Sequence, residues 1–239
     1  MRMTDHKRDF ERDGYLVVDD FFAPAQMLHL DQLIRDYFGE NPDFLHNDEF
    51  LDKAQTDVIP WFPQNEGVAA FDDIETDCRF KDLSRAILGS GWTRQYCMVM
   101  FSKRGTSGQA WHQDCPPDDP RVFNLNRLVY TSDITDEIGG QTVVVPGSHQ
   151  HGLIPAGDPV GIFDNQVVLR PKQGTLVLLH GHTWHRVMPI NGAYRFSINY
   201  RAAPAGTPES VTDVCVYRNM RYQFSISRVI EERGNSGFS

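Results

Sequence analysis

Residues 95–114 read QYCMVMFSKRGTSGQAWHQD, and this stretch decides the class of fold. An aromatic and apolar run at Tyr96–Ser102 is followed by glycines and then by a second short run at Trp111–Asp114. Short runs of this kind, separated by turn residues, are typical of β-strands. Further runs follow at Asn126–Ser132, Thr142–Val145, Gln166–Leu169, Thr175–His180 and Tyr194–Arg201, and Asp213–Ser227 has room for another strand or two. The pattern predicts an all-β sandwich or barrel of about eight strands.

The first third of the chain is predicted to be mainly helical. Helices are expected at Lys7–Asp13, Pro24–Tyr37 and Lys81–Leu88, and a strand at Tyr15–Val18. Gly39–Asp77 shows no steady period and contains three prolines, so an irregular segment or lid is expected there. No repeat or linker divides the chain. We therefore expect one domain over residues 1–239, in which a helical third at 1–94 packs on a β core at 95–227.

The composition favours a globular protein with a small ligand. The chain has 239 residues, 40% of them hydrophobic, and a formal net charge of -9 from 32 acidic and 23 basic residues. Nucleic acids and anionic membranes recruit basic surfaces, so neither is an expected partner. We expect a small-molecule substrate, and the sequence leaves the oligomeric state open. The four cysteines form no CxxC pair and the N-terminus has no apolar signal region, so a cytoplasmic location is expected.

One pair of residues on the second predicted strand is suited to binding a metal ion. Alternate side chains of a strand share a face, so His112 and Asp114 are expected to point the same way. His185 is predicted to lie at the end of a later apolar strand and is the expected third ligand, with His180 and His182 as competitors. Two imidazoles and one carboxylate form a facial triad, which leaves three positions open on a six-coordinate iron. Short HxD pairs are common by chance, so the prediction depends on the other motifs.

An arginine on the next predicted strand is suited to binding a carboxylate. Arg195 and Ser197 share one face at strand spacing. A guanidinium binds a carboxylate through two parallel hydrogen bonds. The pair can therefore hold the far carboxylate of a dicarboxylate whose keto-acid end chelates the metal.

These motifs occur in an order that is found in a known family. They are Phe10–Val18 (FERDGYLVV), Trp111–Asp114 (WHQD), Gly140 with Val144–His149 (VVPGSH), and Trp184, His185, Asn191 and Arg195. In this set, and over nearly the whole chain, the sequence resembles the phytanoyl-CoA dioxygenase family of Fe(II)- and 2-oxoglutarate-dependent oxygenases. The resemblance implies a mainly β fold with flanking α-helices, the double-stranded β-helix, which is a cupin-like jelly roll.

The resemblance also implies a cofactor, two cosubstrates and a reaction. His112, Asp114 and His185 would bind Fe(II), Arg195 would bind 2-oxoglutarate, and dioxygen would oxidise the substrate, most simply by hydroxylating a C–H bond. 2-Oxoglutarate would leave as succinate and carbon dioxide. Family relatives that halogenate lack the carboxylate, so Asp114 argues against halogenation, whereas desaturation, epoxidation and ring formation stay open.

Two points in the resemblance are left open. The residue two positions beyond the distal histidine, a hydroxyl in some members, is Val187 here, so the second anchor for 2-oxoglutarate is expected to be Ser197 first and Tyr130 second. The sequence does not identify the substrate. Residues expected to contact it are Gln109, Trp111, Asn199 and Trp61, although both tryptophans can equally be packing residues.

The competing interpretation is a cupin-like protein that binds a metal or a small ligand without 2-oxoglutarate, such as an isomerase or a binding module. Such a protein has no use for Arg195. Cupins also carry an HxH pair and a later glutamate, where this chain has HxD. The arginine is therefore the feature that favours the oxygenase.

Overall fold

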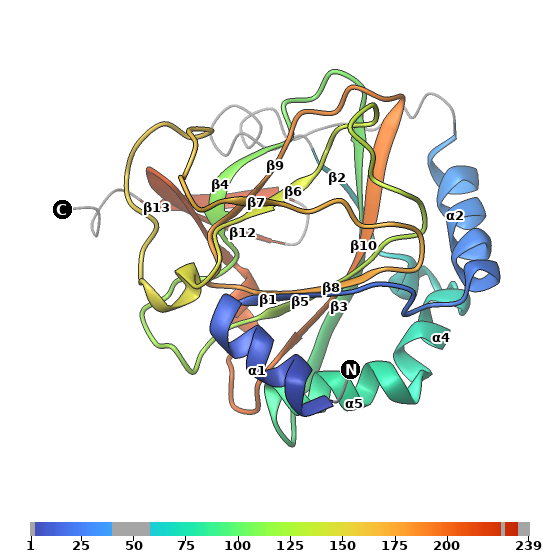
Figure 1. Cartoon of the computed structure of the whole chain (residues 1–239), viewed down its shortest axis with the longest axis horizontal. Helices are drawn as coiled ribbons and strands as arrows, with labels where there is room; N and C mark the ends of the chain where they lie inside the picture. The colour runs from blue at the N-terminus through green and yellow to red at the C-terminus, as the bar shows by residue number, and fades with distance from the viewer. Residues whose placement is uncertain (1–2, 40–57, 226–227, 234–239) are drawn as a thin grey trace.

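The computed structural model describes residues 3–39, 58–225 and 228–233 and consists mainly of two antiparallel sheets (Figure 1). The first sheet has six strands in the order β1 (Tyr15–Val18), β8 (Leu176–His180), β5 (Leu125–Val129), β10 (Tyr194–Ala203), β3 (Thr93–Lys103) and β2 (Ile59–Trp61). The second has seven, in the order β13 (Arg228–Arg233), β12 (Met220–Ser225), β11 (Val214–Tyr217), β4 (Gln109–Gln113), β9 (His185–Val187), β6 (Thr142–Val144) and β7 (Val167–Val168).

The chain passes repeatedly from one sheet to the other. After β3 in the first sheet it enters β4 in the second, then β5 in the first and β6 in the second, and β8 and β9 continue this alternation. This is the topology of a double-stranded β-helix, or jelly roll. The predicted fold, mainly β with flanking helices, is confirmed.

Four α-helices lie on the outer side of the six-stranded sheet (Figure 1). They are α1 (Met3–Asp13), α2 (Pro24–Phe38), α4 (Ala70–Thr76) and α5 (Cys78–Leu88), and short 3-10 helices occur at Pro63–Glu66 (η1), Ser148–Gln150 (η2) and Glu209–Thr212 (η3). Phe196, Ile198 and Tyr200 of β10 face the helices and are buried in one apolar cluster with Met27 and Ile34 of α2. Burial of this cluster, at roughly 25 cal/mol per Å² of apolar surface, holds the helices on the sheet.

The opposite face of β10 is polar. Arg195, Ser197, Asn199 and Arg201 alternate with the core residues and therefore point into the space between the two sheets. Apolar side chains fill part of that space, in a cluster that includes Leu128, Tyr130, Val144, Val177 and Leu179. The sheet is thus apolar toward the helices and carries a row of polar groups toward its partner sheet.

Two local predictions need correction, and a third is confirmed. His185 does not end an apolar strand: it opens the short strand β9, which lies in the other sheet from β8, so residues 181–184 carry the chain between the sheets. The segment predicted to be irregular contains a strand, β2, and a helix, α4. Its part at 40–57 lies outside the described residues. The strands expected after residue 213 are present as β11 and β12.

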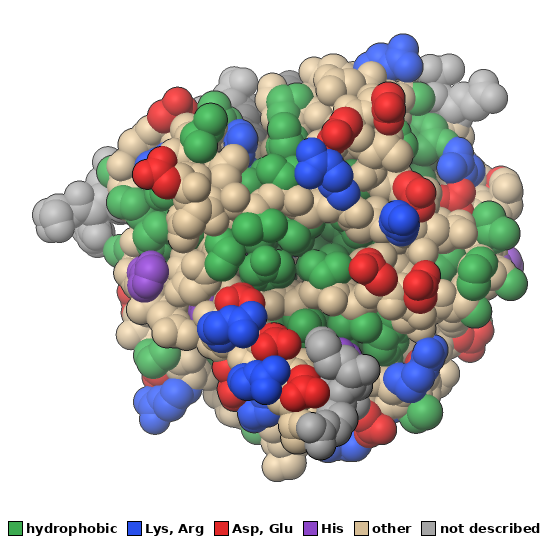
Figure 2. Space-filling model, viewed as in Figure 1, with side chains coloured by type: hydrophobic (Ala, Val, Ile, Leu, Met, Phe, Trp, Pro, Cys, Tyr) green, Lys and Arg blue, Asp and Glu red, His purple; other side chains and the backbone are tan. Residues whose placement is uncertain are grey.

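The outer surface mixes charges of both signs. Figure 2 shows lysine, arginine and acidic side chains spread around a band of hydrophobic side chains, which crosses the middle of this face where the surface is hollowed. Basic side chains do not gather into one patch on this face. No helix within the described residues is long and apolar enough to cross a membrane.

Candidate functional site

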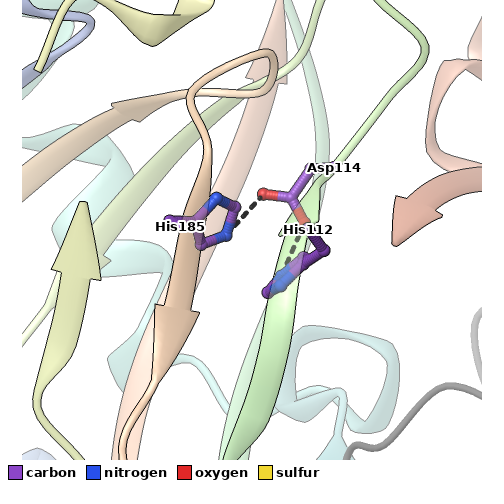
Figure 3. A group of neighbouring side chains, drawn as sticks. All are labelled: His112, Asp114 and His185. Carbon is purple, nitrogen blue, oxygen red and sulfur yellow. Dashed lines mark ion pairs between the residues drawn. The ribbon is translucent and has the colours of Figure 1, made fainter. Parts of the chain in front are cut away.

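Three side chains from neighbouring strands meet between the sheets. His112 lies on β4, Asp114 directly follows it, and His185 opens β9, where it is the register partner of His112 (Figure 3). Their ligand atoms all lie within 4.8 Å of one another. His112 Nε2 is 3.8 Å from Asp114 Oδ1, and His185 Nε2 is 3.5 Å from Asp114 Oδ2. The backbone N–H of Asp114 donates to Gly181 O (2.7 Å), which ties the carboxylate to the turn before His185.

Both imidazoles are oriented by backbone carbonyls. His112 Nδ1 lies 2.7 Å from Ala110 O, and His185 Nδ1 lies 2.9 Å from Thr183 O. A carbonyl oxygen only accepts, so Nδ1 carries the proton in each ring and Nε2 presents its lone pair to the centre of the group. Burial, with a further contribution from the neighbouring His185, lowers the pKa of His112 to about 3. The ring is therefore neutral, which is the form that binds a metal ion.

The carboxylate of Asp114 is held in its ionised form by two residues that the sequence did not single out. Burial by itself acts to raise its pKa, but Arg201, the two histidines and Asn126 together bring the pKa well below its usual range. Arg201 Nη2 lies 3.2 Å from Oδ1, and Asn126 Nδ2 donates to Oδ2 (2.5 Å). The donor set and its charge fit a divalent iron: two neutral imidazoles and one carboxylate.

Arg195 lies buried in the same space without a carboxylate partner. Its Nε donates to Gly140 O (3.2 Å) and its Nη1 to Ser197 Oγ (3.0 Å), and its guanidinium lies 5.9 Å from the centre of the Tyr130 ring. Burial lowers its pKa. No acidic side chain among residues 3–39 and 58–219 lies within ion-pair distance of it. A buried guanidinium with only neutral partners can hold an incoming carboxylate.

The backbone beside Arg195 leaves no room for another side chain. A Cβ atom on Gly140 would lie 2.8 Å from Arg195 Cγ, and Gly140 has a φ of 70°. Glycine is therefore required at this position, both for its conformation and for the close approach of the arginine. The glycine that precedes the VVPGSH motif at Val144–His149 thus has a physical basis in the packing of Arg195.

Comparison with known proteins agrees with this geometry. Residues 10–193 match the family model described as phytanoyl-CoA dioxygenase. The chain belongs to the phytanoyl-CoA dioxygenase family. The matched span includes His112, Asp114 and His185 and ends just before Arg195. Members of this family use Fe(II), 2-oxoglutarate and dioxygen, so these are its cofactor and cosubstrates.

Relatives within and around the phytanoyl-CoA dioxygenase family are distant. Ectoine dioxygenase of Sphingopyxis alaskensis is 26% identical over 157 residues, which is 62% of this chain but 50% of that protein, so the match spans half of the relative's length. The α-ketoglutarate-dependent epimerase SnoN from nogalamycin biosynthesis aligns over 90% of this chain and 85% of its own, with a TM-score of 0.65 and 19% identity. HygX from Streptomyces hygroscopicus, solved with nickel and 2-oxoglutarate, aligns over 86% and 88%, with a TM-score of 0.67 and 14% identity. Identities this low show a shared fold.

The structure separates the predicted substrate residues of this family member into two groups. Asn199 lies on the inward face of β10, and Gln109 shares a register row with Val187 of β9, so both face the space between the sheets. Trp111 lies on the opposite face of β4 from His112, and its Nε1 donates to Gly161 O (2.6 Å). Trp61 packs among the helices against Tyr37, Phe38 and Phe71. Neither tryptophan is brought to the three ligands.

The two competing histidines also lie apart from the three ligands. His180 stacks on Phe123 with ring centres 3.9 Å apart, and its ring lies 4.9 Å from that of His182 and 5.1 Å from that of His149. Among the described residues, His112, Asp114 and His185 form the one group whose side chains are close enough to hold a metal ion together, and His180 and His182 lie outside it. Of the three candidates for the distal ligand, the geometry favours His185.

Proposed function

We propose that this oxygenase hydroxylates a C–H bond of a small organic substrate while 2-oxoglutarate is converted to succinate and carbon dioxide. One observation supports the proposal most directly. A buried group of two histidines and one carboxylate faces the same space as Arg195, a buried arginine without an acidic partner. A site of this kind has a place for a metal and a place for a dicarboxylate.

His112, Asp114 and His185 would hold the iron from one side. Their backbone and side-chain partners fix them before the metal arrives, so little reorganisation is needed when it binds. A metal held by these three residues would keep ligand positions for 2-oxoglutarate and dioxygen. When bound, the iron supplies the oxidation of the substrate by dioxygen, coupled to loss of carbon dioxide from 2-oxoglutarate.

Arg195 would hold the far carboxylate of 2-oxoglutarate, with Ser197 and Tyr130 beside it. Ser197 accepts from Arg195 Nη1, which fixes the plane of the guanidinium and leaves its own hydroxyl proton free to donate to a carboxylate oxygen. Tyr130 lies under the guanidinium, and its hydroxyl is 3.4 Å from Thr142 Oγ1. Ser197 is therefore our first choice for the second anchor and Tyr130, which also contacts Arg195, is our second.

The rest of the space between the sheets would position the substrate and exclude water. Met98 and Met100 of β3 pair with Asn199 and Ser197 of β10 and share their inward face, and Leu128 of β5 pairs with Asn199 from the other side. These apolar side chains offer a dry surface beside the polar row of β10. A metal-binding isomerase without 2-oxoglutarate would have no use for Arg195, so the arginine also argues against that alternative.

The proposal is tested by incubating the purified protein with Fe(II) and 2-oxoglutarate under ¹⁸O-labelled dioxygen, across fatty acyl thioesters, amino-acid derivatives and natural products. We expect succinate formation that one substrate class stimulates, with one ¹⁸O atom in the organic product. Epimerisation or desaturation would leave no ¹⁸O there. His112→Ala is expected to abolish succinate formation, and His29→Ala, an exposed histidine on α2, is the matched control. Turnover that survives His112→Ala would refute the assignment.

A further inference from the structure

A second buried arginine lies beside the candidate metal ligands, at the other end of the polar row from Arg195. Arg201 donates to Asn126 Oδ1 from both Nε (3.0 Å) and Nη2 (2.6 Å), and Nη2 also lies 3.2 Å from Asp114 Oδ1. Its guanidinium is 5.4 Å from the centre of the Tyr96 ring. These contacts use Nε and Nη2, and they leave the Nη1 end of the guanidinium available for a ligand.

The formal charges between the sheets would not sum to zero with iron and 2-oxoglutarate bound. In the described part of the chain, Asp114 is the one carboxylate within ion-pair distance of Arg201, and Arg195 has none. Burial raises the pKa of Tyr96 to about 12, so this neighbour of Arg201 is neutral. Asp213, which also acts on Tyr96, is only partly buried.

The iron dication and the 2-oxoglutarate dianion cancel each other, and Asp114 offsets one of the two arginines. One positive charge therefore remains beside the metal. Because an uncompensated charge in a poorly solvated space is costly, a ligand with one negative charge is favoured there.

The inward side chains of β3 near Arg201 are partly exposed. Tyr96, Met98 and Met100 point between the sheets and are each only partly buried, whereas Cys97 and Val99, which point to the helices, are 2% and 0% exposed. The exposed parts of one aromatic and two thioether side chains offer a surface that suits an apolar body next to the charged group.

One buried polar atom in this region has no partner. Asn199 Nδ2 donates to Asn126 Oδ1 (2.7 Å), and since that oxygen also accepts from Arg201, the amide of Asn199 cannot be reversed. Asn199 Oδ1 is left buried without a hydrogen bond. A buried acceptor without a partner is unfavourable, and a ligand that also carries a hydrogen-bond donor would satisfy it.

We propose that Arg201 binds a carboxylate of the substrate, so that the oxygenase acts on a small organic monoanion with an apolar body. This inference rests on the proposed function and names the substrate class for the same site. Arg201 and Arg195 are six residues apart on one strand, which places their Cα atoms about 20 Å apart at the usual rise per residue. Each arginine can therefore serve a different carboxylate, Arg195 that of 2-oxoglutarate and Arg201 that of the substrate.

The test compares acids with their uncharged amides and needs no knowledge of the natural substrate. Protein loaded with Mn(II) and saturating 2-oxoglutarate is titrated in a calorimeter with benzoate, phenylacetate and octanoate, and with their primary amides. At least one acid is expected to bind about tenfold or more tightly than its amide. Raising the 2-oxoglutarate concentration should leave that affinity unchanged. Equal binding of acids and amides, binding of none of them, or displacement of the acid by 2-oxoglutarate would overturn the proposal.

Substitutions of Arg201 then test whether this residue causes the preference for acids over their amides. Arg201→Gln is expected to remove the preference for the acid, and Arg201→Lys to retain part of it. Arg121→Gln, at an arginine whose side chain is 87% exposed, is the matched control and should behave as wild type. If Arg201→Gln weakens only Mn(II) or 2-oxoglutarate binding and keeps the preference, Arg201 merely positions Asp114 or binds 2-oxoglutarate, and the proposal fails.

The acid-and-amide comparison in the wild-type protein stands even if the variant does not fold. Failure of the proposed function has a different signature: the wild-type protein would then form no succinate from 2-oxoglutarate with Fe(II) in any assay.

Discussion

Two buried arginines on opposite faces of the six-stranded sheet show how the same side chain serves stability on one face and binding on the other. Arg127 of β5 faces the helices, and its Nη2 lies 2.6 Å from Glu75 Oε1 of α4. Its Nε donates to Tyr200 O (2.7 Å), its Nη1 to Ser84 Oγ (3.1 Å), and Phe80 stacks on it at 4.5 Å. Arg127 therefore has a charged partner and donates from all three of its nitrogens.

Arg195 of β10 faces the partner sheet and is buried to a similar degree, yet within the described residues its partners are a backbone carbonyl and the hydroxyl-bearing side chains of Ser197 and Tyr130, none of which is an anion. Burying a charge is costly unless it is paired. The completed set of partners around Arg127 therefore indicates a structural role, and the missing anion at Arg195 indicates a site for a ligand. Four sets of substitutions test whether the two faces of the sheet differ in this way, and we give the one with the greatest expected effect first.

Removing the carboxylate between the sheets should have the largest effect. Asp114→Ala takes away a proposed metal ligand and leaves Arg201 without its acidic partner, so metal affinity is expected to fall by more than about 100-fold, since losing even an outer partner of a ligand costs up to that much. Mn(II) binding measured by electron paramagnetic resonance checks this. Asp82→Ala, at an exposed acid on α5, is the control. Unchanged Mn(II) affinity in Asp114→Ala would contradict the metal assignment.

Breaking the ion pair on the helix side should affect folding alone. Glu75→Gln leaves Arg127 buried without a charged partner, which is expected to cost about 3–5 kcal/mol of unfolding free energy. Denaturant titration measures it. The double change Glu75→Leu with Arg127→Met removes both charges and should recover most of the loss. The affinity for 2-oxoglutarate of the folded protein should not change in either variant, and a change would mean that the two faces are coupled.

Replacing the arginine between the sheets should affect binding. Arg195→Gln removes the charge that meets the far carboxylate of 2-oxoglutarate. A hydrogen bond to a charged group is worth about 1.5–3 kcal/mol, so the KM for 2-oxoglutarate is expected to rise about 100-fold while kcat at saturation stays within a few-fold. Steady-state succinate formation gives both constants. A large loss of unfolding free energy without a change in KM would assign Arg195 a structural role like that of Arg127.

Two serines give the smallest and best matched comparison, because each contacts one of the arginines. Ser197→Ala removes the oxygen that accepts from Arg195 and should raise the KM for 2-oxoglutarate several-fold with little effect on folding. Ser84→Ala removes the oxygen that accepts from Arg127 and should lower the unfolding free energy by about 1 kcal/mol with no effect on KM. If the two changes had the same effect on KM, the distinction between the faces would not hold.

Local periodicity was enough to predict one part of the site. The spacing of two between His112 and Asp114, and between Arg195 and Ser197, places each pair on one strand face whatever the sheet around it. The same alternation predicts that Trp111, one residue from His112, points to the other face of its strand, so it could have excluded Trp111 from the substrate residues. The alternation also predicts that Asn199 and Arg201 lie on the same face of β10 as Arg195 and Ser197.

Other parts of the site depend on which strands become neighbours. Asn126 and Arg201 reach Asp114 only because β5 and β10 pair in one sheet while β4 lies in the other. No local pattern specifies that arrangement. The three-residue strand β9 is likewise too short for a recognisable period, so the apolar strand before His185 predicts the wrong strand for it, and the family motif is what points to this histidine.

The central claim is that the iron site and Arg195 act on one molecule of 2-oxoglutarate. Absorption spectroscopy under anaerobic conditions tests it most directly, because 2-oxoglutarate chelated to Fe(II) gives a weak visible charge-transfer band. The account predicts a band in the wild-type protein, the same band at about 100-fold higher 2-oxoglutarate in Arg195→Gln, and no band in Asp114→Ala. A wild-type protein without the band, or an Arg195→Gln protein that forms it at the wild-type concentration, would contradict the claim.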